Sequence, residues 1–197
     1  MPNKERSHFF AYLSRMKLIR RWSLMRNTHP ESIQEHSHRV AMIAHGLAVV
    51  RNRIFGGQAN PDRTALLAIY HDAAEVITGD LPTPVKHFNP AIKTAYKGIE
   101  KVASERLVRM LPESLRQEYA PVFFPEGEDE KHMELVRAAD KICAYLKCLE
   151  ELSAGNREFS KAEKATRQAL EVMPLPEVRY FLETFVPSFK LTLDELD

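Results

Sequence analysis

Apolar side chains recur every three or four residues along most of this sequence, which is the spacing of one face of an α-helix. Seven glycines in 197 residues, with little alternation of β-branched residues, leave few places for strands or tight hairpins. The sequence therefore predicts an all-α, single-domain helical bundle over residues 1–197, because neither a repeat nor a linker divides the chain.

Capping residues mark where several helices begin. Ser32 and Glu35 form a capping box, and Asn60–Pro61 joins an N-cap residue to a proline at the first helical position. A rigid loop is expected at 80–84 because it holds two prolines, and another loop at 121–130. The expected helices are 7–18, 32–51, 61–79, 90–110, 130–154, 159–173 and 177–186, and a short segment is expected at 113–119. The core side of the helix 90–110 is expected to be formed by Ile92, Tyr96, Ile99, Val102 and Leu107.

Composition excludes several classes of function. A formal charge of +1 provides no global field for a nucleic acid polymer or an anionic membrane. No run of about 18 apolar residues is present, and the N-terminus lacks the apolar segment of a signal peptide. The two cysteines, Cys143 and Cys148, lie five residues apart in one expected helix, which disfavours a disulfide. We therefore expect a cytoplasmic protein.

His71 and Asp72 are adjacent within an otherwise apolar segment, residues 65–76, that we expect to be helical. An ionised carboxylate is costly to bury unless it is paired or binds a cation. Side chains of neighbouring helical residues point about 100° apart. The side chains of His71 and Asp72 can therefore contact one partner only if it lies between their two directions, as a shared metal ion would.

Two further helices carry a polar residue on an apolar stripe. His36 begins the stripe Val40, Ile43, Leu47, Val50, and Asp140 interrupts Met133, Val136, Cys143, Leu146. Singly, each has an ordinary explanation: a hydrogen-bonded core histidine, or an aspartate paired with Arg137 or Lys141. Together, His36, His71, Asp72 and Asp140 supply two imidazoles and two carboxylates, a set that suits manganese, iron, cobalt or zinc and leaves coordination positions open for catalysis.

The order His36, His71–Asp72, Asp140 resembles the H…HD…D signature of the HD superfamily of metal-dependent phosphohydrolases. Longer segments resemble the bacterial HD-domain 5′-deoxynucleotidases, and together they span nearly the whole chain. These segments are 7–10, 35–37, 71–75, 79–86, 139–151 and 185–189. An HD-type helical bundle is therefore expected.

This resemblance implies hydrolysis of deoxyribonucleoside 5′-monophosphates by a homodimeric enzyme. It also implies one divalent transition metal, most often cobalt or manganese, with zinc, iron and copper left open. Other HD phosphohydrolases act on triphosphates, cyclic dinucleotides or alarmones, and a non-catalytic nucleotide-binding protein is a further alternative.

The resemblance also assigns roles to residues outside the ligand set. The resemblance implies that Glu75 is the catalytic acid or base. Without the resemblance, Glu75 would be interpreted as an exposed partner in an ion pair. Arg21 and Trp22 become substrate contacts, although alone they read as a solvated charge and a core aromatic. The expected substrate-binding residues are Arg21, Trp22, His36, Asp72, Asp80, Leu81, Pro82 and Thr83, where Asp80 has the alternative of capping local backbone.

Four more histidines bear on the number of metal ions. His87 and His132 are available for a second ion, but neither belongs to a recognisable dinuclear pattern. His38 and His45 lie on a different face of their helix from His36. We therefore expect one metal ion.

Overall fold

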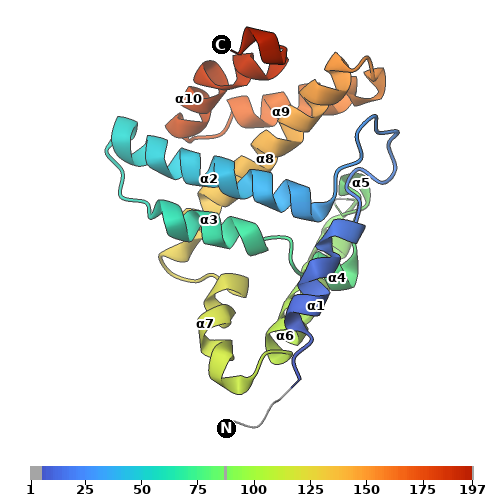
Figure 1. Ribbon diagram of the computed structural model, residues 1–197, viewed down its shortest axis with the longest axis vertical. Helices are drawn as coiled ribbons and strands as arrows, with labels where there is room; N and C mark the ends of the chain where they lie inside the picture. Colours follow the sequence, from blue (N-terminus) through green and yellow to red (C-terminus); the bar gives the residue numbers. More distant parts are fainter. Residues whose placement is uncertain (1–5, 87, 197) are drawn as a thin grey trace.

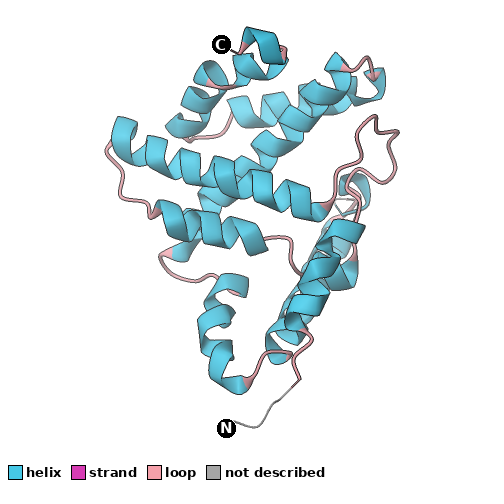
Figure 2. Cartoon of the chain, viewed as in Figure 1, coloured by secondary structure: helices cyan, strands magenta, loops and turns pink. Residues whose placement is uncertain are grey.

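The computed structural model describes residues 6–86 and 88–196 of the chain. These ranges form helices that are connected by loops (Figures 1 and 2). Within those ranges no β-strand occurs, and extended pairing is limited to one antiparallel bridge between Arg20 and Ser32. No helix in the same ranges has both the length and the apolarity of a membrane span. The all-α prediction is confirmed.

Ten α-helices and four 3-10 helices follow one another in the described ranges. They are α1 (Phe9–Leu13), η1 (Ser14–Leu18), α2 (Ile33–Phe55), α3 (Pro61–Tyr70), α4 (Glu75–Thr78), α5 (Thr83–Lys86), α6 (Pro90–Arg109), α7 (Glu113–Phe123), α8 (Asp129–Ser153), η2 (Arg157–Phe159), α9 (Ser160–Glu171), α10 (Pro176–Thr184), η3 (Val186–Lys190) and η4 (Leu193–Glu195).

The main core lies where α2, α3 and α8 cross near the middle of the molecule (Figure 1). Leu47, Leu67 and Leu146 are fully buried there, one from each helix. The predicted stripe on α2 is buried along its whole length, including His36. Burial of a leucine-sized side chain contributes about 1.5–3 kcal/mol. This crossing therefore holds α2 and α8, which carry two of the predicted ligands, and α3, which leads into the turn that carries the other two.

A smaller apolar cluster joins α1 to α6 and α7 at the other end of the molecule. Phe9 is its centre, fully buried, with its ring edge-on to Tyr119 at a centroid distance of 5.1 Å. Leu107 and Leu111 complete the buried set. This cluster fixes α1, from which the chain continues through η1 to Arg21 and Trp22.

The predicted core side of α6 is partly wrong. Tyr96 and Leu107 are buried, but Ile99 and Val102 are 55% and 63% exposed. The buried side instead includes Ala103 and Val108. The physical reason is that α6 lies at the edge of the fold, where α1, α4, α5 and α7 contact it and leave its other side uncovered.

The end of α7 also differs from the prediction, because the helix continues through Pro121 to Phe123. Outside the first turn of a helix, a proline removes one backbone hydrogen bond and its ring clashes with the carbonyl four residues earlier, so continuation through Pro121 needs compensating contacts. Val122 is buried and Phe123 packs on the cluster around Phe9, so apolar contacts extend the helix beyond the proline.

The expected helix 61–79 is the largest error, because α3 ends at Tyr70 and residues 71–74 form turns before α4. The ring Nδ1 of His71 lies 2.7 Å from the carbonyl oxygen of Ala68. In a continuous α-helix that carbonyl would accept from the amide of Asp72. The imidazole therefore competes for the backbone acceptor, and the chain turns at the metal-ligand candidates themselves.

The capping box predicted at the start of α2 is confirmed. The Ser32 hydroxyl accepts from the amide of Glu35 at 3.3 Å, and the Glu35 carboxylate accepts from the amide of Ser32 at 2.7 Å. We expect Ser32→Ala to lower the free energy of unfolding by about 1 kcal/mol, measured by urea denaturation. Thr192→Ala is the matched control, because its capping box with Glu195 serves only the exposed terminal η4. Equal losses in both variants would contradict this account.

Candidate metal centre

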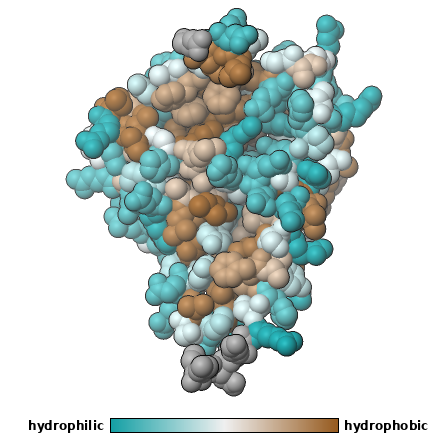
Figure 3. All heavy atoms as spheres, viewed as in Figure 1, coloured by the Kyte–Doolittle hydropathy of each residue, from teal (hydrophilic) through white to brown (hydrophobic). Residues whose placement is uncertain are grey.

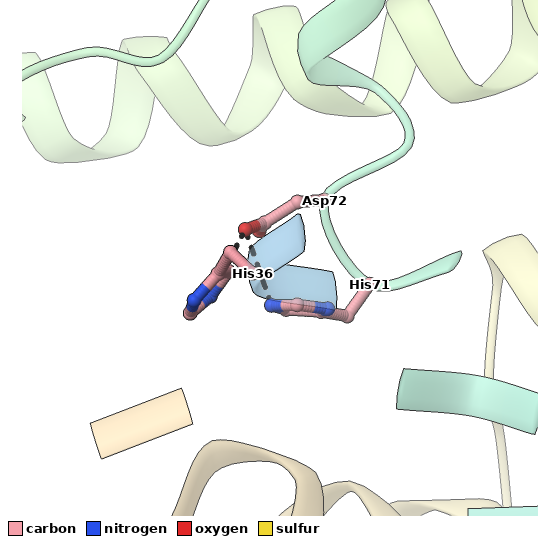
Figure 4. A group of neighbouring side chains, drawn as sticks. All are labelled: His36, His71 and Asp72. Carbon is pink, nitrogen blue, oxygen red and sulfur yellow. Dashed lines mark ion pairs between the residues drawn. The ribbon is translucent and has the colours of Figure 1, made fainter. Parts of the chain in front are cut away.

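Two helices and one turn carry the four predicted ligands. His36 lies in the second turn of α2, His71 and Asp72 occupy the turn after α3, and Asp140 lies near the middle of α8. Figure 4 shows the side chains of His36, His71 and Asp72 pointing toward one another. Their potential ligand atoms all lie within 4.8 Å of each other.

The separations between these atoms fit ligands of one ion. Asp72 Oδ2 lies 3.1 Å from His71 Nε2 and 3.7 Å from His36 Nε2. Asp140 Oδ1 lies 3.1 Å from His36 Nε2. Ligand atoms about 2.0–2.2 Å from a metal ion are about 3.0–3.6 Å apart when adjacent. Asp140 lies outside the group of three whose ligand atoms are all within 4.8 Å of one another, and it is connected to that group through His36.

The hydrogen bonds of the two imidazoles support the same interpretation. His71 Nδ1 is held by the Ala68 carbonyl, which leaves Nε2 pointing into the cluster as the ligand atom. That Nε2 and the Nε2 of His36 are buried and make no hydrogen bond among the described residues, and each faces a carboxylate, Asp72 or Asp140, at 3.1 Å. Buried polar atoms are costly when unpaired, so these nitrogens suit a cation as their missing partner.

Electrostatics keeps the carboxylates ionised. Burial opposes charge on Asp72, but the adjacent His71 and His36 outweigh it and hold the pKa of Asp72 far below its usual range. Burial likewise opposes charge on Asp140, and contact with His36 lowers its pKa. Burial disfavours the imidazolium of His71, yet Asp72 raises its pKa to about 9. The cluster therefore favours bound positive charge.

Arg21 reaches into the same cluster from the loop before α2. Its guanidinium contacts Asp72 at 3.4 Å and Asp140 at 3.8 Å, while Nε donates to Glu31 at 3.2 Å. The side chain is mostly buried, which contradicts its interpretation as a solvated charge. Arg21 therefore lies beside the ligand candidates, where its guanidinium group could bind an anion, and its contact with substrate stays a prediction.

Glu75 is buried at the start of α4, with only 4% of its surface exposed. One carboxyl oxygen, Oε2, lacks a hydrogen-bond partner among the described residues. Burial, followed by the charges of Asp72 and Asp80, raises the pKa of Glu75 to about 9. A protonated carboxyl group beside the ligands can transfer a proton, whereas an exposed ion-pair partner is excluded by the burial.

Trp22 adopts a left-handed backbone conformation, with φ of 56°, which is uncommon for a bulky residue. Its ring packs on Phe159 at a centroid distance of 5.3 Å, and its indole nitrogen is buried without a partner in the described structure. The side chain is only partly buried, so it is not a core aromatic. Strained residues of this kind cluster at functional sites.

The proline-stiffened loop leads from α4 into α5, a short helix that the sequence did not predict. Asp80, Leu81 and Pro82 are partly buried, whereas Thr83 is exposed and begins α5. Burial raises the pKa of Asp80, and the positive charge of Arg21 opposes that shift. Asp80 therefore lies within electrostatic range of the metal-ligand cluster; Leu81, Pro82 and Thr83 stay substrate contacts by prediction.

The remaining histidines lie elsewhere. The ring Nε2 of His132 accepts from the amide of Asn60 at 3.0 Å, and its other ring nitrogen lies beside Asp129. His45 is beside Asp62 at 3.9 Å, and His38 is exposed on α2. His87 lies outside the described residues. Within the described ranges, the metal-ligand group is the one that contains His36, His71 and Asp72.

Several residues near the site were missed by the sequence analysis. Glu31 orients Arg21, and Lys86 on α5 affects the pKa values of Glu75 and Asp80. Lys147 and Glu151, four residues apart on α8, are both buried. Charged residues at that spacing are usual on solvated helices; only Lys147 stands inside an apolar run, 142–149, and Glu151 lies beyond the end of that run.

Sequence comparisons agree with this geometry. The family model described as 5′-deoxynucleotidase YfbR-like matches residues 8–189. A 5′-deoxynucleotidase of Vibrio parahaemolyticus is 55% identical over 190 residues, which cover 96% of this chain and 98% of the relative. The 5′-deoxynucleotidase YfbR of Salmonella paratyphi B is 56% identical over 192 residues, which cover 98% of this chain and 96% of the relative.

Solved structures share the fold at low sequence identity. An HD-domain phosphohydrolase from Listeria innocua gives a TM-score of 0.79 at 22% identity, with 92% of this chain and 88% of that chain covered. The cyanophage S-2L HD phosphohydrolase DatZ, bound to dA and one catalytic Zn²⁺, gives a TM-score of 0.64 at 21% identity. The match covers 92% of this chain and 96% of that chain. The chain therefore belongs to the YfbR-like family of 5′-deoxynucleotidases, which have the HD-domain phosphohydrolase fold, and it is an enzyme of that class.

Proposed function

We propose that this enzyme hydrolyses deoxyribonucleoside 5′-monophosphates to deoxyribonucleosides and phosphate, using one divalent metal ion held by His36, His71, Asp72 and Asp140. The observation that carries the proposal is the convergence of unpartnered imidazole nitrogens and ionised carboxylates at distances suited to one ion. The names of the relatives supply the deoxynucleotide class. Cobalt or manganese is the proposed ion, with zinc, iron and copper also compatible with the donor set.

The ion, when bound, supplies Lewis acidity toward the phosphoryl group and favours ionisation of a water molecule. Arg21 is placed to bind a phosphoryl oxygen, because its guanidinium already contacts the ligand carboxylates Asp72 and Asp140. Its contact with Glu31 holds the side chain in that direction. We assign to Glu75 a proton transfer to or from the reacting oxygen, because its carboxyl group is buried beside Asp72.

The substrate's sugar and base are assigned to the surfaces on either side of the ligands. Trp22 offers a flat aromatic wall beside Arg21, held in place by Phe159. The loop 80–83 offers a carboxylate, a hydroxyl and backbone groups for the sugar or phosphate. His36 and Asp72 are proposed to contact the substrate as well as the ion.

A nucleotide panel tests the substrate class. With manganese or cobalt present, we expect phosphate release from each deoxyribonucleoside 5′-monophosphate with a higher kcat/KM than from its ribonucleotide counterpart, measured as inorganic phosphate. An Asp72→Asn preparation run in parallel controls for contaminating phosphatase. Release of triphosphate or pyrophosphate from deoxynucleoside triphosphates, without hydrolysis of monophosphates, would contradict the proposal and favour another HD phosphohydrolase activity.

We further propose that the chain acts as one domain, in the cytoplasm, as a homodimer. The buried cysteines Cys143 and Cys148 are both free thiols, which suits a reducing compartment.

The proposed dimer has a candidate surface. Apolar surface is visible at the C-terminal end of the molecule in Figure 3. Phe181 belongs to the core, whereas the exposed side chains there are Phe185, Phe189, Leu191, Leu193 and Leu196. Sedimentation equilibrium should give twice the chain mass of 22.6 kDa; a monomeric mass would remove the dimer proposal.

A further inference from the structure

The loop between η1 and α2, residues 19–32, folds as a closed hairpin whose neck lies at the metal centre. The bridge between Arg20 and Ser32 closes the neck, and the amide of Arg21 donates to the Glu31 carbonyl at 2.9 Å. Trp22 follows directly and begins the tip of the hairpin, which comprises residues 22–29. The position of the tip therefore determines where Trp22 stands relative to Arg21.

A buried carboxylate on α8 binds the far side of this tip. Glu151 is 1% exposed, and it accepts from the Thr28 amide at 2.9 Å, the Thr28 hydroxyl at 2.6 Å and the His29 amide at 3.2 Å. The side-chain amide of Asn156 donates to the same carboxylate at 2.7 Å. One side chain thus accepts from two backbone amides of the loop and ties them to α8.

Lys147 completes the arrangement. It is 3% exposed, pairs with Glu151 one helical turn away, and donates to the carbonyl of His29. A buried ion pair gives weak evidence for stability, because desolvation offsets the attraction of the two charges. Apart from the bond to Asn156, the remaining bonds of both charged groups are to the loop, at Thr28 and His29, so what the pair specifies is the conformation of the loop.

Contacts within the tip extend this control to Trp22. The Asn27 side-chain amide donates to the carbonyls of Trp22 and Met25, at 3.2 and 2.9 Å. Phe159 packs on the Trp22 ring at 5.3 Å, and the ammonium of Lys147 lies 5.8 Å from the centroid of the same phenyl ring. A φ of 56° costs free energy for a tryptophan, and it persists only where surrounding contacts impose it.

The helix that anchors the loop also carries a proposed metal ligand. Asp140 precedes Lys147 by seven residues on α8, which is two turns or about 10 Å along the axis. Arg21 contacts Asp140 directly. Through α8, the loop tip and the ligand cluster are therefore parts of one rigid frame.

We propose that Lys147 and Glu151 are positioning residues for substrate selection: they clamp the 22–29 tip onto α8 and thereby hold Trp22 and Arg21 in the orientation that recognises the deoxynucleotide. This inference rests on the proposed function for the role of the loop, but the clamp itself is a statement about conformation. It touches no substrate and no metal ion.

Fluorescence tests the clamp without any assay of activity, because Trp22 is the only tryptophan of the chain. In Glu151→Gln we expect a red-shifted emission maximum and stronger quenching by acrylamide, since the tip loses its ionic anchor and Trp22 becomes more exposed to water. The variant must be folded by far-ultraviolet circular dichroism. A folded Glu151→Gln protein with wild-type emission and quenching would overturn the clamp.

Kinetics then tests the consequence for selection. Loss of a hydrogen-bonded buried charge typically changes an equilibrium by about 10- to 100-fold. We expect KM for a deoxyribonucleoside monophosphate to rise by about that factor in Glu151→Gln, with a smaller change in kcat. The preference for deoxyribose over ribose should shrink, and metal affinity should stay unchanged. Unchanged KM and preference alongside the fluorescence shift would overturn the selective role.

Glu177→Gln is the matched control, because Glu177 is also 1% exposed and ion-paired, with Arg51 between α10 and α2. It should lower thermal stability while leaving Trp22 emission, KM and sugar preference unchanged. If Glu151→Gln does not fold, Thr28→Val removes only the hydroxyl bond to Glu151 and should shift emission and KM in the same direction, to a smaller extent. Absence of deoxynucleotide hydrolysis in the wild type would refute the proposed function while leaving the fluorescence result interpretable.

Discussion

Replacing Glu75 with glutamine is expected to reduce kcat by about 10²- to 10⁴-fold, the usual contribution of a general acid or base, while metal and nucleotide still bind. The glutamine keeps the size of the side chain but cannot exchange the proton. Burial at the start of α4 and the neighbouring Asp72 and Asp80 single out this carboxyl among the glutamates near the site.

The measurement is single-turnover phosphate release, together with equilibrium binding of manganese and of a deoxynucleoside monophosphate. Glu105→Gln serves as the control, because Glu105 lies on α6 in an i,i+4 pair with Arg109, at a partly exposed position. It should retain wild-type turnover. Normal turnover in Glu75→Gln would remove the catalytic role, and loss of metal binding in that variant would make Glu75 a ligand instead.

Replacing Asp72 with asparagine is expected to have the second large effect, a loss of metal affinity and of turnover together. Asp72 is the carboxylate that lies beside both imidazoles, at 3.1 Å from His71 and 3.7 Å from His36. Substitution of a residue that only supports a metal ligand lowers metal affinity by about 10- to 100-fold, so substitution of a ligand should lower it at least as much. Calorimetric titration with manganese measures this metal affinity.

Asp129→Asn is the matched control for that titration. Asp129 also stands beside a histidine, His132 at 3.4 Å, but its carboxylate is committed to Arg63. The variant should keep wild-type metal affinity and turnover. Tight metal binding by Asp72→Asn, or its loss in Asp129→Asn, would contradict the assignment of the ligands.

The proximity of the ligand candidates was predictable from the sequence because each of them stands in an otherwise apolar stripe or segment. Hydrophobic periodicity places His36 on α2 and Asp140 on α8 in the core; His36 is buried as predicted, whereas the side chain of Asp140 is 41% exposed. The Ser32 capping box was likewise a local pattern with a local cause. Such features depend on neighbouring residues in the chain.

The break between α3 and α4 was not predictable in the same way. Residues 71–74 contain neither glycine nor proline, and their propensities favour a continuous helix. The turn there accompanies the approach of the His71 ring to the Ala68 carbonyl, an interaction that competes with the helical backbone bond. The site thus departs from the local preference of its own sequence, as functional sites often do.

Burial of Lys147 and Glu151 was missed for a different reason. At i,i+4 they match the pattern of a solvent-exposed helical ion pair. Their burial arises from a loop more than 100 residues away in sequence, whose Thr28 amide and hydroxyl bind the Glu151 carboxylate. Nothing in the pattern of α8 alone specifies that contact.

The most direct test of the metal-dependent site is the number of ions bound per chain, measured alongside phosphate release. Chelator-treated protein should be inactive toward a deoxyribonucleoside monophosphate. Activity should return in proportion to manganese or cobalt bound and reach its maximum at one ion per chain, with no recovery in Asp72→Asn. Full hydrolysis by metal-free protein, or recovery that requires two ions per chain, would contradict a single-ion centre formed by His36, His71, Asp72 and Asp140.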